Sequence, residues 1–154
     1  MNTASAFTKL MTIAMTSLAL LGNAQAAEPL KMQLQANKVT TNAAGQLVYA
    51  PVNTAPVGTV IQYKATYTNT IDKDISDLAV VVPIPINMTF TGDVIPASAQ
   101  ASIDSKNYAD LPLMRKVDGK MVKIPLSEYR SLRWHIKLLP AKKSAAVAFN
   151  TTVD

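Results

Sequence analysis

Apolar and polar side chains alternate along much of this chain, and this period of two constrains the fold more than any other feature. In the clearest run, Leu132, Trp134, Ile136 and Leu138 alternate with Arg133, His135 and Lys137. Successive side chains of an extended strand point to opposite faces, so this pattern predicts strands with one buried face. Trp134 takes the inward parity, and we expect it to be a core anchor.

The same pattern recurs over residues 30–37, 46–50, 61–68 and 88–90, with a shorter strand expected near residues 101–103 and a last strand in which Val147, Phe149 and Val153 share the inward parity. Residues 75–84 are almost continuously apolar, which predicts a strand covered on both faces or at the centre of a sandwich. Asp118-Gly119 lies between Met114–Val117 and Lys120–Ile124 and predicts a type I′ hairpin, since both central residues of that turn take a positive φ. The expected fold class is all-β: an immunoglobulin-like β-sandwich of seven to eight strands with Greek-key connections.

The first 26 residues follow the layout of a cleaved helical signal peptide. Lys9 supplies the positive charge, Leu10–Leu21 is an apolar run, and Ala24-Gln25-Ala26 offers a cleavage site. Such a run spans only about 18 Å as a helix, against the ~30 Å hydrocarbon core of a membrane. We therefore expect a signal peptide over residues 1–26 and one domain over residues 27–154, with no transmembrane span after cleavage. The expected location is the periplasm, the cell surface or the extracellular medium.

Three passages resemble the bacterial conserved-repeat domain, also called domain of unknown function eleven. They are Val57–Asn69, Asp77–Pro85 with Met88–Phe90, and Trp134–Phe149, which contains Trp-His-Ile, Leu-Pro-Ala-Lys and Val-Ala-Phe. The chain departs from the family pattern at Val57, where the family prefers Pro, and at Ala141-Lys142, where it prefers Gly. The resemblance implies an immunoglobulin-like sandwich in an exported or surface-associated protein, and it implies no enzymatic activity.

Charge is distributed unevenly along the sequence. Residues 27–105 carry four basic and six acidic side chains, whereas residues 106–143 carry ten basic and three acidic ones. If the predicted hairpin packs near the 132–138 strand, six cations form one anion-binding face: Arg115, Lys116, Lys120, Lys123, Arg133 and Lys137. The alternative is a solvated edge, where lysines deter pairing between sheets. Nucleic acid is not an expected partner, because the aromatic residues fall on the inward parity.

No combination of residues predicts catalysis. His135, the single histidine, lies on the polar parity of its strand between two cations. Asp72, Asp74 and Asp77 are expected to form an ordinary polar turn, with a calcium site as the weaker alternative because no glycine allows a tight wrap. We expect no catalytic residue, no metal site and no cofactor.

The sequence therefore predicts a non-enzymatic envelope or surface protein, acting as a structural or adhesin-like interaction module. A module that binds an anionic envelope component through the basic strand face is the alternative. The sequence specifies neither the partner nor the oligomeric state.

Overall fold

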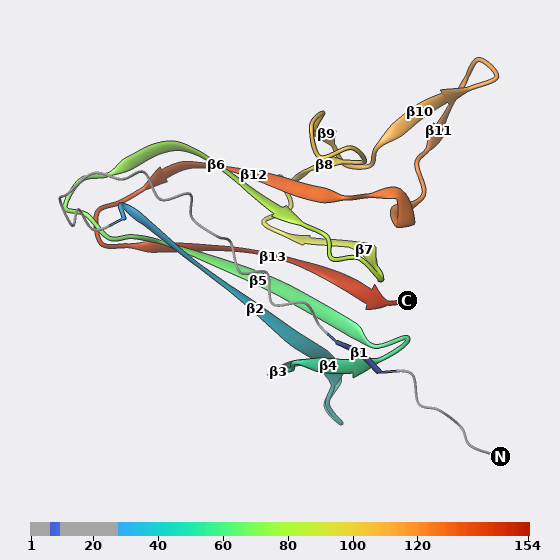
Figure 1. The fold of residues 1–154 in the computed structure, drawn as a ribbon, viewed down its shortest axis with the longest axis horizontal. Helices are drawn as coiled ribbons and strands as arrows, with labels where there is room; N and C mark the ends of the chain where they lie inside the picture. Colours follow the sequence, from blue (N-terminus) through green and yellow to red (C-terminus); the bar gives the residue numbers. More distant parts are fainter. Residues whose placement is uncertain (1–6, 10–27) are drawn as a thin grey trace.

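The computed structural model describes residues 7–9 and 28–154, and almost all of its regular structure is antiparallel strand (Figure 1). One sheet has the order β3 (Leu47–Pro51), β2 (Leu30–Thr41), β5 (Val60–Asn69), β13 (Ser144–Val153), β7 (Met88–Ile95). The other has the order β6 (Ile75–Pro83), β12 (Ser131–Leu139), β8 (Gln100–Ser102), β9 (Ala109–Asp110). The all-β prediction is confirmed, and these two open sheets are consistent with a β-sandwich.

Two smaller pairs of strands lie outside these sheets. β10 (Met114–Val117) pairs with β11 (Lys120–Lys123), and β1 (Phe7–Lys9) pairs with β4 (Thr54–Pro56). A 3-10 turn, η1 (Leu126–Glu128), leads into β12. Apart from β1, the predicted signal peptide lies outside the described residues. No helix in the described part of the chain is long and apolar enough to cross a membrane.

The immunoglobulin-like strand order is not confirmed. In the constant-type order the last two strands share one sheet, whereas β12 and β13 belong to different sheets. The described residues also place nine strands in the two sheets, against the expected seven to eight. The pairs β5–β13, β6–β12 and β8–β9 nest inside one another along the chain, which is typical of double-sheet jelly rolls.

Residues 75–84 differ from the prediction of a strand covered on both faces. They form β6, which pairs only with β12 and so lies at the edge of its sheet. Val80 and Val82 face the core, but Val81 is 40% exposed. The apolar run therefore reflects one buried face, with aliphatic side chains also on the solvent side.

The core lies between the two sheets and joins side chains from both. Tyr63 of β5 stacks on Phe149 of β13 with ring centroids 5.5 Å apart, and Phe149 meets Trp134 of β12 at 6.4 Å. Trp134 is buried as expected, and its indole N–H donates to the Pro96 carbonyl at 3.0 Å. Burial raises the pKa of Tyr63 to about 12, so its phenol stays neutral in this apolar setting.

A buried asparagine fastens two turns at one end of the sandwich. Asn69, the last residue of β5, donates through Nδ2 to the carbonyls of Lys73, Leu139 and Pro140 at 2.8–3.1 Å. Its Oδ1 accepts from the backbone N–H of Ile71. One side chain thus links the β5–β6 turn to the β12–β13 turn.

The register of β12 gives a direct stability test. Because Trp134 is buried and His135 is exposed, Trp134→Ala should lower the free energy of unfolding by about 3–5 kcal/mol. His135→Ala should change it by less than about 0.5 kcal/mol. Urea unfolding of both variants measures the difference, and the reverse order would show that β12 is shifted by one residue.

Candidate functional site

The β10–β11 hairpin is the first candidate contact surface. It forms its own two-stranded sheet and extends beyond the end of the sandwich (Figure 1). Asp118 and Gly119 have φ values of 48° and 80°, which confirms the predicted turn. All eight residues of the two strands are exposed. Four of the six predicted anion-binding residues, Arg115, Lys116, Lys120 and Lys123, lie here; Arg133 and Lys137 lie on β12.

Each face of the hairpin combines cationic with apolar side chains. Cross-strand partners share a face, and Met114 pairs with Lys123 while Lys116 pairs with Met121. The opposite face carries Arg115, Val117, Lys120 and Val122. Met121 is the most exposed of the apolar four, at 61%. Exposed apolar groups beside cations are suited to a partner that offers both anionic and apolar surface.

Buried residues fix the base of the hairpin to the core. Leu113 and Ile124 are buried, and the Ile124 N–H donates to the Leu113 carbonyl at 2.9 Å. The Leu113 N–H donates to the Tyr129 hydroxyl at 2.8 Å. The Tyr129 ring packs against Phe90, with centroids 5.6 Å apart. The exposed strands β10 and β11 are therefore attached to the core through buried, hydrogen-bonded residues at their base.

The two predicted arginines are already engaged within the chain. Arg115 makes a bidentate ion pair with Glu128, with N–O distances of 2.7 and 3.1 Å. Arg133 donates to the Gln100 side chain, and its guanidinium lies 4.4 Å from the centre of the Tyr108 ring. Within the described ranges, Lys116, Lys120, Lys123 and Lys137 have no acidic partner. The free positive charge of the predicted face therefore belongs to its lysines.

The loop that carries Tyr108 is organised by one carboxylate. Asp104 accepts from the backbone N–H groups of Asn107 and Lys106 and from the side chains of Asn107 and Ser102. These hydrogen bonds, that from the Asn107 backbone first, hold the pKa of the exposed Asp104 well below its usual range. The loop contacts therefore persist above the ordinary carboxylate pKa and are lost only as the pH falls through the lowered value.

Asp72 and Asp74 lie in the turn between β5 and β6, whereas Asp77 lies within β6 and not in the predicted polar turn. Asp74 accepts from the Ala141 N–H at 2.9 Å, and Asp72 pairs with Lys142 at 3.6 Å. Asp77 has a φ of 51°. Residues 7–9 and 28–154 contain no group of three or more His, Cys, Asp or Glu side chains placed to hold a metal ion.

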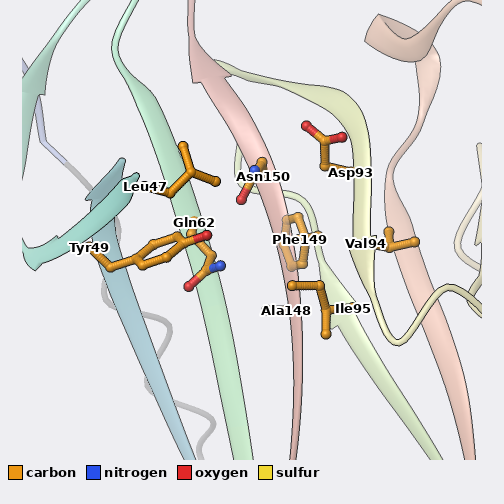
Figure 2. A pocket seen from close by; sticks show the side chains of 9 residues that line it. All are labelled: Leu47, Tyr49, Gln62, Asp93, Val94, Ile95, Ala148, Phe149 and Asn150. Carbon is orange, nitrogen blue, oxygen red and sulfur yellow. The ribbon is translucent and has the colours of Figure 1, made fainter. Parts of the chain in front are cut away.

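A groove on the outer face of the five-stranded sheet is the second candidate site, and no pattern in the sequence indicated it. Its volume is about 300 Å³. Figure 2 shows Leu47 and Tyr49 of β3 on one side, Gln62 and Asn150 in the middle, and Asp93 and Ile95 of β7 on the other side. The groove thus crosses the sheet from one edge strand to the other.

Three amide side chains lie in one row across the sheet beside and beneath this groove. Asn37 of β2 pairs with Gln62 of β5, which pairs with Asn150 of β13. Asn37 and Gln62 are buried although they occupy the outer parity. The alternation of residues 61–68 places Gln62 on the outward face of its strand, but only the order of the strands in the sheet brings the three amides together.

None of the family models, curated proteins or solved structures compared with the chain matches it.

The hairpin anchor yields a prediction. Tyr129→Phe removes the hydroxyl that accepts from the buried Leu113 N–H, so the variant should lose about 1–3 kcal/mol of stability. Thermal or urea unfolding measures the loss. Tyr49→Phe is the control, because Tyr49 is exposed and its hydroxyl makes no hydrogen bond within the described residues; equal effects would contradict the anchoring role.

Proposed function

We propose that the mature chain is an exported, non-enzymatic interaction module that contacts its partner with the β10–β11 hairpin. The observation that supports this is the hairpin itself, a fully exposed element held on a buried base. An isolated two-stranded hairpin is marginally stable in water, so the anchoring by Leu113, Ile124 and Tyr129 maintains a surface that contributes little to the core. The signal-peptide pattern of residues 1–26 supports export.

A second proposal concerns the partner, which we infer to be an anionic envelope component. Lys116, Lys120 and Lys123 lie within one short hairpin and have no acidic partner in the described part of the chain. Clustered cations near an anionic surface each contribute about 1 kcal/mol of attraction. Neighbouring methionines, flexible and polarizable, adapt to irregular apolar surface. The resemblance to the conserved-repeat domain stays a prediction and is compatible with this role.

The lysines provide the test. Simultaneous Lys116→Gln, Lys120→Gln and Lys123→Gln changes should weaken binding of residues 27–154 to purified lipopolysaccharide, or to phosphatidylglycerol vesicles, by about a hundredfold, given ~1 kcal/mol for each of the three cations. Wild-type binding should also weaken steeply as salt rises from low ionic strength to about 0.5 M, because screening shortens the reach of these charges. Co-sedimentation and isothermal titration calorimetry measure both effects.

A charge-matched control separates the hairpin from overall charge. Lys31→Gln, Lys64→Gln and Lys73→Gln remove the same charge from exposed lysines outside the hairpin, and this variant should bind nearly as the wild type does. Equal losses in the two triple variants would rule out a hairpin site. Met121→Ser with Val122→Ser tests the wider role: if neither the lysine nor the apolar changes affect binding, the hairpin is not the contact surface.

A further inference from the structure

The groove on the five-stranded sheet contains an amide that belongs to a mostly buried residue but is itself accessible, since the Tyr63 hydroxyl is the single buried side-chain polar atom without a partner among the described residues. The Gln62 residue is only 7% exposed, and its side chain makes no hydrogen bond with the described residues. It nevertheless lines the groove, where Figure 2 shows its amide between Tyr49 and β13. An amide held in place by a mostly buried residue and open to a groove can donate to and accept from a ligand that displaces water there.

Asn150 provides a second amide beside Gln62. The two residues are directly opposed on neighbouring strands. A register irregularity between β13 and β7 occurs at Asn150, where the Asn150 carbonyl accepts from the Thr91 hydroxyl. Bulges of this kind re-aim side chains and are common beside binding sites. Each amide offers both a donor and an acceptor, so the pair can satisfy hydroxyl groups in either orientation.

The walls of the groove are apolar and its charge is low. Tyr49, Leu47 and Ile95 are 42%, 57% and 59% exposed, so an aromatic ring and two aliphatic side chains are open to a ligand. Asp93 is the single charged side chain among the lining residues, and no cation lines the groove. This disfavours an anionic ligand and separates the groove in chemistry from the lysine-bearing hairpin.

We propose that this groove binds a short segment of a neutral oligosaccharide. Sugars present apolar C–H faces together with hydroxyl groups that both donate and accept hydrogen bonds. The exposed Tyr49 ring and the aliphatic walls fit the C–H faces, while the Gln62 and Asn150 amides and the Asp93 carboxylate fit the hydroxyls. A volume of about 300 Å³ lies at the small end of ligand sites, which suits a few sugar rings and not a folded partner.

Titration of the isotope-labelled mature chain with maltohexaose, cellohexaose and hexa-N-acetylchitohexaose tests the proposal. At least one of these should shift the side-chain NH₂ signals of Gln62 and Asn150 and the ring signals of Tyr49, with a dissociation constant of about 1 mM or tighter. Tyr49→Ala and Gln62→Ala should each weaken that binding about tenfold, as expected for loss of one well-placed contact.

Matched controls show that the loss is local. Val48→Ala alters the neighbouring β3 residue on the other face, and Gln33→Ala removes an exposed amide of β2 outside the groove; both should bind like the wild type. The hairpin triple-lysine variant should also retain sugar binding, which keeps this test separate from that of the proposed function. Failure of all three sugars to shift these signals, or equal losses in variants and controls, would overturn the proposal.

Discussion

Each of the two sheets buries one face against the other, and this packing holds the fold together. Tyr63, Phe149 and Trp134 join the central strands of both sheets in a single aromatic cluster. The chain has no cysteine, so packing and hydrogen bonding must hold the sheets together without disulfides. Asn69 adds a polar link at one end by satisfying three carbonyls of two separate turns. Such a buried, fully paired group stabilises only the arrangement that supplies all its partners.

The two candidate surfaces use this scaffold in different ways. The hairpin is held at its base and offers lysines and methionines on two strands whose residues are all exposed. The groove lies directly on the five-stranded sheet, where the positions of its amides are set by the pairing of β2, β5 and β13. A rigid sheet suits a site that must place a few hydrogen bonds accurately, whereas an exposed hairpin suits contact with an extended or irregular surface. The chemistry of the two surfaces also differs: one is cationic, and the other carries a single carboxylate.

Sequence alone predicted what depends on local periodicity and turn chemistry. The parity of Trp134 and His135, the Asp118-Gly119 hairpin and most strand positions are confirmed. The order of the strands in each sheet could not be predicted, because no local sequence pattern indicates that β13 lies between β5 and β7. The same limit explains why β6 was expected to be covered on both faces. It also explains why Gln62, a polar residue on the outer parity, was not expected to be buried beside two other amides. The sequence also could not predict which of the six cations are paired within the chain. In the structure, Glu128 binds Arg115 and Gln100 binds Arg133.

Amide hydrogen exchange of the mature chain, followed by nuclear magnetic resonance, shows whether the packed sheets hold the fold together and the hairpin lies outside them. Protection rises with burial and with the cooperativity of the surrounding hydrogen bonds. We expect the slowest exchange in β5, β13 and β12, whose ladders are paired on both sides, and much faster exchange in β10 and β11 beyond the Leu113–Ile124 pair. Hairpin amides protected as strongly as those of β5 and β13 would contradict this expectation, because the hairpin would then be part of the packed sandwich.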